Sequence, residues 1–334
     1  MEREMQAVIT EQYGNLDSVK VVSVKVPELK EGYVLVQMEN SPINVSDLLS
    51  AYGVYHSKPL PVILGLEGSG KVVESGGGPL ADSLVGKRVA VAADTEVATG
   101  TWAEYALINA NACMPLKDEV TFPEAASMIV NPMTVALFMA KIREGNNQAI
   151  MQNAASSALG KMFIKWCNEE GVKSINLVRR GEQVEELRNL GAELVYDTSD
   201  PNWKDQVRQK CRELKVKVAF DAVGGVVTND MMELLEPEGI VYNYGALSGE
   251  NCQAFPMHLI GADKSLRGLW LTKWLSTLTG EQKMQVSEEV QQKIKGVLKT
   301  EYSKEVHLGQ VADALKEYDS RKTNNKILIR TKPN

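Results

Sequence analysis

From about residue 148 the sequence alternates short apolar segments with helical patterns, and this alternation restricts the possible folds more than any other feature. The apolar segments are AIMQNA (149–154), SINLVRR (174–180), LVYDT (194–198), KVAFDAVGG (217–225) and IVYNYGAL (240–247). Strands that alternate with helices form βαβ units, in which a parallel sheet carries helices on both faces. The sequence therefore predicts an α/β fold with a doubly wound nucleotide-binding domain over residues 125–270.

The first part of the chain follows a different pattern. Up to residue 124, β-branched segments such as VKVVSVKV (19–26) are punctuated by Gly, Pro, Asp and Asn. This pattern favours a strongly bent antiparallel sheet or partial barrel. The tail has two helical patterns and ends in NKILIRT (325–331), a strand that can rejoin the first sheet. We therefore expect a β-rich domain, 1–124 and 271–334, that the nucleotide domain interrupts.

Composition narrows the function classes. The chain has 334 residues, 44% of them hydrophobic, and a net charge of −6, so a nucleic-acid or membrane-surface partner is not expected. Its 4 cysteines are widely spaced and show no metal-ligand pattern, which suits a reducing compartment. No apolar run approaches the ~20 residues that span a bilayer. We expect a cytosolic protein, with the mitochondrial matrix as the alternative, because a processed organellar form would look the same.

The segment QNAASSALGK (152–161) occupies the place of a glycine-rich phosphate loop but holds a single glycine. A strand-to-helix turn favours phosphate because the free N–H groups and dipole of the helix attract negative charge. Small residues can replace glycine wherever the backbone is not left-handed, and a serine can cap the helix. Any strand-to-helix turn with a capping serine would look similar. The candidate phosphate-binding residues are Ser156, Ser157, Ala158, Leu159 and Gly160.

The next strand ends in an arginine pair. About 20 residues after the phosphate loop, NAD-binding proteins usually place an acid and NADP-binding proteins an arginine. This chain has Arg179 and Arg180 there. Guanidinium pairs bidentately with phosphate, whereas cations gain nothing from the dipole at a helix start. The pair favours NADPH, although two solvated arginines remain the alternative.

Together these segments resemble the medium-chain dehydrogenase/reductase superfamily, in particular its zinc-free branch of 2-enoyl thioester reductases and quinone oxidoreductases. The resemblance covers nearly the whole chain. It is carried by SPINVSDLLSAYGVY (41–55), GLEGSGKVV (65–73), GTWAEYALI (100–108), AASMIVNPMTVA (125–136), QNAASSALGK (152–161), NLVRR (176–180), DAVGG (221–225), NYGALSG (243–249) and LRGLWLTKWL (266–275). The VNP, QNA, VRR and GLWLTKW segments are more similar to mitochondrial-type enoyl thioester reductases. The resemblance implies a GroES-like partial barrel and a Rossmann domain.

Two departures from the superfamily pattern affect the chemistry. Zinc-dependent relatives place a Cys and a His where this chain reads NVSD (44–47) and GLEG (65–68), and it has 3 histidines, His56, His258 and His307. We therefore expect no catalytic zinc. The relatives also usually carry glycine at the position of Ala158.

The resemblance also implies roles for individual residues. Tyr55, eight residues after Asp47, would be the proton donor, because a phenol can hydrogen-bond or protonate the enolate that forms on an α,β-unsaturated carbonyl. Residues implied along the cofactor are Asn131, Thr134, Tyr244, Gly245, Ala246, Leu247, Leu269, Trp270, Leu271 and Lys326.

Three functions remain open. The first is an NADPH-dependent reductase of 2-enoyl thioesters, either enoyl-CoA or enoyl-carrier protein, and the second is a quinone or alkenal reductase. The third is a non-catalytic relative that serves as a structural or assembly component. The apolar run SLRGLWL (265–271) ends the expected parallel sheet, and an uncovered sheet edge is a liability. We therefore expect a homodimer joined there, as the resemblance also implies.

Overall fold

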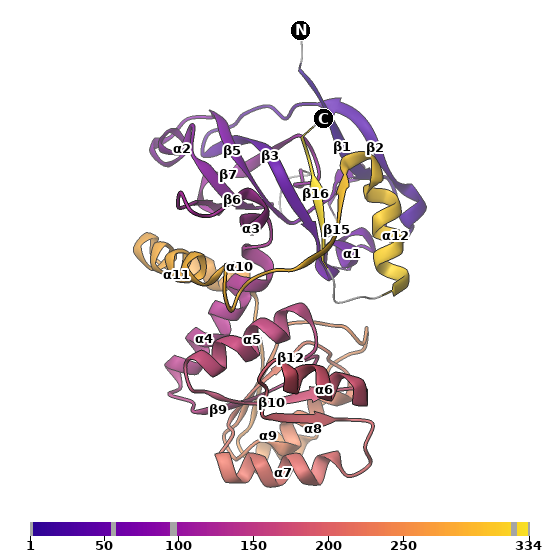
Figure 1. Ribbon diagram of the computed structural model, residues 1–334, viewed down its shortest axis with the longest axis vertical. Helices are drawn as coiled ribbons and strands as arrows, with labels where there is room; N and C mark the ends of the chain where they lie inside the picture. The colour runs from indigo at the N-terminus through magenta and orange to yellow at the C-terminus, as the bar shows by residue number, and fades with distance from the viewer. Residues whose placement is uncertain (1–2, 55–57, 94–98, 322–325, 333–334) are drawn as a thin grey trace. The chain divides into compact units, whose positions relative to one another are not determined.

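The computed structural model describes residues 3–54, 58–93, 99–321 and 326–332. The chain forms two compact units, Met1–Pro132 with Ser287–Asn334 and Met133–Val286. The first is β-rich and the second is an α/β unit (Figure 1).

The β-rich unit contains two sheets. The strands are β1 (Glu4–Thr10), β2 (Val19–Lys25), β3 (Tyr33–Ile43), β4 (Val62–Ile63), β5 (Glu67–Ser75), β6 (Arg88–Ala92), β7 (Tyr105–Asn109), β8 (Cys113–Pro115), β15 (Tyr302–His307) and β16 (Lys326–Arg330). The smaller sheet has the order β2-β1-β4, and the larger one β15-β16-β3-β5-β6-β8, with β7 on β3. The helices are α1 (Val45–Ala51), α2 (Pro79–Leu84), α3 (Phe122–Ala126), α12 (Val311–Arg321) and the last part of α11 (Gly280–Lys293).

The final strand returns to the first sheet, as expected. Strand β16 pairs antiparallel with β3 and parallel with β15. Its apolar residues join a core with residues of β1, β3, α1 and α12. Strand β15 was not expected from the sequence; its side chains are mostly exposed, so it lacks an apolar run.

The α/β unit has a parallel sheet with the order β11-β10-β9-β12-β13-β14. Its strands are β9 (Ala149–Gln152), β10 (Lys173–Val178), β11 (Leu194–Asp197), β12 (Val218–Asp221), β13 (Ile240–Asn243) and β14 (Ser265–Gly268). Its helices are α4 (Thr134–Glu144), α5 (Ala158–Glu169), α6 (Gly181–Asn189), α7 (Trp203–Leu214), α8 (Val226–Leu234), α9 (Pro256–Ile260) and α10 (Leu271–Thr277). Residues of α5 and α6 form one core with the sheet, and residues of α7 and α8 another. Helices therefore cover both faces, which confirms the doubly wound expectation (Figure 1).

The boundaries between the units differ from those expected at 124 and 271. The segment 125–132 stays with the β-rich unit, whose Tyr302 hydroxyl bonds the Ser127 hydroxyl at 2.8 Å. At the other boundary, α10 contacts α4 and stays with the α/β unit. The units therefore divide after Pro132 and Val286.

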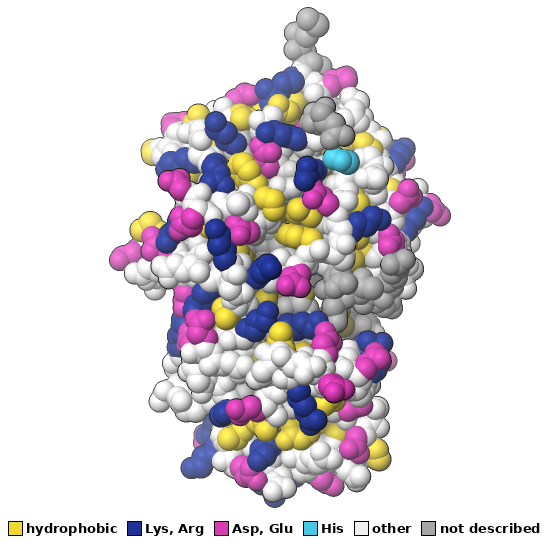
Figure 2. Space-filling model, in the orientation of Figure 1, with side chains coloured by type: hydrophobic (Ala, Val, Ile, Leu, Met, Phe, Trp, Pro, Cys, Tyr) yellow, Lys and Arg dark blue, Asp and Glu magenta, His cyan; other side chains and the backbone are white. Residues whose placement is uncertain are grey.

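Within the described part of the chain, no helix has both the length and the apolar character needed to cross a membrane. On the face drawn in Figure 2, the basic and acidic side chains of the described residues are interspersed.

Candidate functional site

The β9–α5 turn has the features of a phosphate loop. Ser157 is the N-cap of α5, and its hydroxyl accepts from the Gly160 N–H at 3.1 Å. A Cβ on Gly160 would lie 2.5 Å from the Ala155 carbonyl oxygen, so the single glycine stands where helix and turn approach most closely. Ala158 and Leu159 form the first helical positions, as expected. The turn keeps the close backbone approach that glycines usually provide in such loops.

Ala154, in the same turn, corrects one expectation. Small residues were expected to replace glycine because the turn would avoid left-handed backbone, yet Ala154 has φ of 48°. Alanine seldom adopts this conformation because its Cβ crowds the following carbonyl. The turn therefore contains a strained residue, and such residues cluster at functional sites.

Gln183 links this turn to the arginine pair. Its side-chain amide donates to the Ser156 hydroxyl at 2.6 Å, and its side-chain oxygen accepts from the Arg179 N–H at 3.2 Å. Arg180 is the N-cap of α6, and its exposed side chain pairs with Glu182. Both guanidinium groups are exposed at the end of β10, the strand next to β9. The sequence did not single out Gln183, because its role depends on a contact 27 residues away.

The turns after β12 and β13 lie beside this site in the sheet. The buried Asp221 carboxylate accepts from the Asn153 amide and from the Val223 and Gly224 N–H groups. A Cβ on Gly245 would lie 2.6 Å from the Ala222 carbonyl oxygen, so this position also needs glycine. The remaining expected contacts of the second turn are the half-buried Tyr244 and the exposed Ala246 and Leu247.

The three residues expected at the end of the sheet lie beyond its last strand, between β14 and α10 or at the start of α10. Leu269 follows β14, the half-exposed Trp270 is the N-cap of α10, and Leu271 begins that helix. The strand is therefore shorter than the run 265–271 that the sequence suggested. Contact of these residues with a cofactor stays a prediction.

A cluster of buried charges lies in the β-rich unit. The Asp47 carboxylate accepts from the Asn44 N–H at 2.7 Å and the Leu66 N–H at 2.8 Å. The Lys326 ammonium lies 3.5 Å from Glu67, and both side chains are at most 4% exposed. Burial, with the charge of Glu67, raises the pKa of Asp47 to about 7, while burial lowers the pKa of Lys326. Lys326 was expected near the cofactor; its ammonium belongs to this cluster.

Glu67 also contacts the segment that carries the expected nicotinamide-binding residues. Its carboxylate accepts from the N–H groups of Ile129 and Val130, each at 2.9 Å. These residues begin a π-helical turn, Ile129–Met133, that contains Asn131 and precedes Thr134 at the start of α4. From GLEG (65–68) we expected only the absence of zinc, and the contact of Glu67 with this turn was not expected. The available signal was an acid inside an apolar, glycine-rich strand.

The proposed proton donor, Tyr55, and His56 lie outside the described residues. The nearest described tyrosine is Tyr52, whose hydroxyl donates to Asp319 at 2.7 Å. Among the described residues no group of three or more His, Cys, Asp or Glu could hold a metal ion. The expectation of no zinc stays a prediction.

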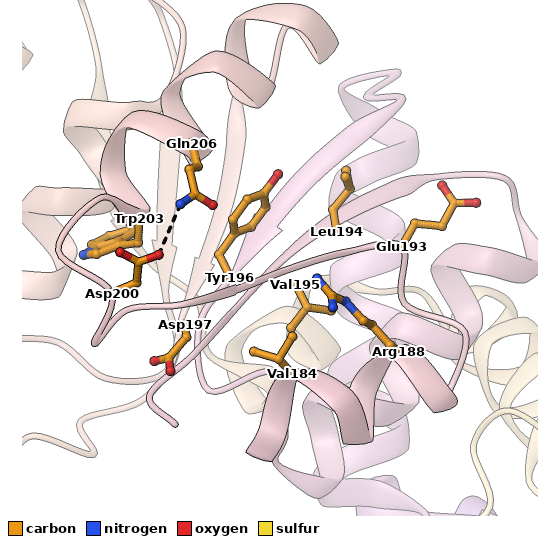
Figure 3. A pocket seen from close by; sticks show the side chains of 10 residues that line it. All are labelled: Val184, Arg188, Glu193, Leu194, Val195, Tyr196, Asp197, Asp200, Trp203 and Gln206. Carbon is orange, nitrogen blue, oxygen red and sulfur yellow. Dashed lines mark hydrogen bonds between the residues drawn. The ribbon is translucent and has the colours of Figure 1, made fainter. Parts of the chain in front are cut away.

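A pocket of about 250 Å³ lies along the edge strand β11 and is lined by side chains of α6, β11 and α7 (Figure 3). The lining residues include Arg188, Tyr196 and Asp200; Asp200 lies in the turn between β11 and α7, and its carboxylate accepts from the Gln206 side-chain amide. None of the expected cofactor residues lines it. The pocket therefore does not mark the site that the turns define.

Two family models match the chain. Residues 30–118 match the alcohol dehydrogenase GroES-like domain, and residues 158–288 match the zinc-binding dehydrogenase domain. The words 'zinc-binding' belong to the name of the family model. In this chain the segments NVSD (44–47) and GLEG (65–68) contain neither Cys nor His.

Relatives of two kinds are similar to the chain. A mitochondrial enoyl-[acyl-carrier-protein] reductase of Arabidopsis thaliana is 30% identical over 81% of this chain and 73% of its own length. One of Caenorhabditis elegans is 33% identical over 80% and 76%. A crystal structure of a Mesorhizobium loti protein, assigned provisionally as an NADPH:quinone reductase, is 28% identical with a TM-score of 0.89 over 99% of both chains.

Proposed function

This chain belongs to the medium-chain dehydrogenase/reductase superfamily, and from that premise we propose that it is an NADPH-dependent reductase of the carbon–carbon double bond of 2-enoyl thioesters. The observation that carries the proposal is the pairing of a serine-capped phosphate turn with two exposed arginines on the neighbouring strand end. The enoyl thioester class is supported by the Arabidopsis and Caenorhabditis relatives.

The residues of the α/β unit fit a dinucleotide with a 2′-phosphate. The turn offers N–H groups at a helix N-terminus, and Gly160 leaves room for close backbone packing. Arg179 and Arg180 supply guanidinium donors for the 2′-phosphate, and Gln183 holds the Arg179 backbone beside the turn. Thr134, at the start of α4 in this unit, and Asn131, in the π-helical turn before it, are proposed to orient the nicotinamide.

When bound, NADPH supplies the hydride for the β-carbon of the substrate. Tyr55 is proposed to hydrogen-bond the thioester carbonyl and to supply the proton as negative charge develops there. Asp47 lies on α1, eight residues before Tyr55. Because Asp47 bonds the Asn44 and Leu66 N–H groups, it holds the start of α1 against the chain that precedes β5.

Replacement of the proton donor tests the mechanism. Tyr55→Phe should leave NADPH affinity nearly intact and lower kcat with crotonyl-CoA about 100-fold or more, because the hydroxyl acts on developing charge. Tyr52→Phe is the matched control and should keep kcat, since its hydroxyl bonds Asp319. Equal kcat in Tyr55→Phe and the parent would assign Tyr55 a packing role.

A quinone reductase is the second candidate, favoured by the 28% identity to the Mesorhizobium protein. NADPH oxidation measured in parallel with crotonyl-CoA, a long-chain enoyl-CoA and a quinone separates the two. Turnover of the quinone alone would select the alternative, and turnover of none would select a non-catalytic relative. The compartment expected from the sequence stays a prediction.

A further inference from the structure

Glu67 is a buried carboxylate with four donors around it. One oxygen accepts from the Ile129 and Val130 N–H groups, each at 2.9 Å. The other accepts from the Asn44 side-chain amide at 3.0 Å and lies 3.5 Å from the Lys326 ammonium. Both oxygens are therefore engaged, and one side chain connects three segments distant in the sequence.

Burying this charge requires compensation, because an ion loses its hydration when it leaves water. The Glu67 side chain is 0% exposed, and the Lys326 ammonium beside it also interacts electrostatically with the Asp47 carboxyl. A buried pair is weak evidence for stability, since apolar residues of similar volume often stabilise equally well. The groups that donate to Glu67 say more about its role than its ion pair with Lys326 does.

Two of the donors are backbone groups at the start of the π-helical turn Ile129–Met133. The first N–H groups of a helix lack partners within the helix. A carboxylate there accepts from them, and its negative charge interacts favourably with the positive end of the helix dipole. π-Helical turns are rare and are frequent at functional sites. This one carries the half-buried Asn131, one residue after the anchored Val130.

We propose that Glu67 is a positioning residue, whose carboxylate anchors this turn and thereby fixes Asn131 for contact with the cofactor. The contact of Asn131 with NADPH rests on the proposed function; the anchoring of the turn does not. Other polar contacts hold the chain just before the turn: the Ser69 hydroxyl donates to the Phe122 carbonyl, and Tyr302 bonds Ser127. Glu67 alone among these three contacts the turn itself.

Anchoring is tested without cofactor. Hydrogen–deuterium exchange is compared for the parent, Glu67→Gln and Glu74→Gln, the same change at an exposed position of strand β5 that pairs with Arg3. Glutamine offers one oxygen where four donors need two. The Ile129 and Val130 amides should exchange about tenfold faster or more in Glu67→Gln and at the parent rate in Glu74→Gln. Equal rates in all three proteins would overturn the anchor.

The consequence for the cofactor is tested with a double-mutant cycle. NADPH dissociation constants are measured by the fluorescence of the bound nucleotide for the parent, Glu67→Gln, Asn131→Ala and the double variant. If Glu67 acts through Asn131, Glu67→Gln weakens binding about tenfold, and adding it to Asn131→Ala costs little more. Losses that multiply, or no loss in Glu67→Gln, would overturn the positioning role.

Two other outcomes, a Glu67→Gln variant that does not fold and a parent that does not bind NADPH, also lead to a decision. If Glu67→Gln does not fold, Glu67→Asp replaces it, because it keeps the charge and withdraws the carboxylate by one methylene; the same exchange and binding outcomes apply. If the parent does not bind NADPH, the proposed function and the cofactor role of Asn131 both fail, while the exchange experiment still decides whether Glu67 anchors the turn.

Discussion

At the scale of single residues, Ala154 gives a direct test of the phosphate turn. Its φ of 48° costs alanine roughly 1 kcal/mol relative to glycine. Ala154→Gly should therefore raise the free energy of unfolding by about 0.5–1 kcal/mol in a urea titration. Ala158→Gly, at the first position of α5, is the control and should lower it slightly, because glycine is a poor helix former. A loss of stability in Ala154→Gly would show that the left-handed backbone is not strained.

The arginine pair tests the choice of cofactor. A charge-assisted bond to phosphate contributes about 1.5–3 kcal/mol, so Arg179→Ala with Arg180→Ala should weaken NADPH binding by one to several powers of ten, at about 1.4 kcal/mol per power of ten. NADH lacks the 2′-phosphate and should bind the variant and parent alike, as measured by fluorescence titration. Arg188→Ala, in the last turn of α6, the helix that follows the arginine pair, should change neither the NADPH nor the NADH affinity. Parallel losses for NADPH and NADH would assign the arginines a structural role.

At the scale of elements, the buried cluster that joins α1, β5 and β16 makes stability depend on pH. The pKa of Asp47 rises from 3.8 when unfolded to about 7 when folded, through burial and the charge of Glu67. The folded state therefore binds the extra proton, and this contribution is complete below about pH 4 and lost as pH rises through about 7. One such group changes the free energy of unfolding by at most about 1.4 kcal/mol per pH unit.

Asp47→Asn removes the titrating group, so the decrease in unfolding free energy between pH 5 and pH 8 should become shallower in urea titrations. Asp17→Asn changes an exposed acid paired with Lys316 and serves as the control. An unchanged slope in Asp47→Asn would mean that Asp47 does not titrate in this range.

The strands and the local features of the turns could be predicted from the sequence, whereas contacts between distant residues could not. Strands β9 to β13 were predictable because each is a short apolar run between helical patterns. The capping role of Ser157 and the place of Arg179 and Arg180 followed from spacing along one βαβ unit. Gln183 and Glu67 act through partners 27 and 62 residues away, and local spacing contains no signal for such contacts.

At the scale of the whole molecule, we predict a homodimer formed along the edge of the α/β sheet. Strand β14 is the last strand in that sheet. The neighbouring helix α9 exposes apolar side chains, with Ile260 at 78% and Met257 at 54% exposure. Light scattering at micromolar protein should give the mass of two chains, and Ile260→Asp should shift it toward one chain, because a charge would be buried in the interface. Met284→Asp, an exposed apolar residue of α11, should leave the mass unchanged. A monomeric parent would remove the dimer.

The position of β16 also sets the order in which a nascent chain can acquire structure. The α/β unit is one uninterrupted stretch, so all its residues have been translated well before Lys326 is added. The larger β-sheet, in contrast, cannot be completed until β16 has been translated, because β16 lies between β3 and β15. This strand also carries Lys326, the only lysine paired with Glu67 among the described residues. A chain that ends before Lys326 lacks β16, so β3 and β15 lose the strand that pairs with both of them, and Glu67 and Asp47 lose the Lys326 ammonium.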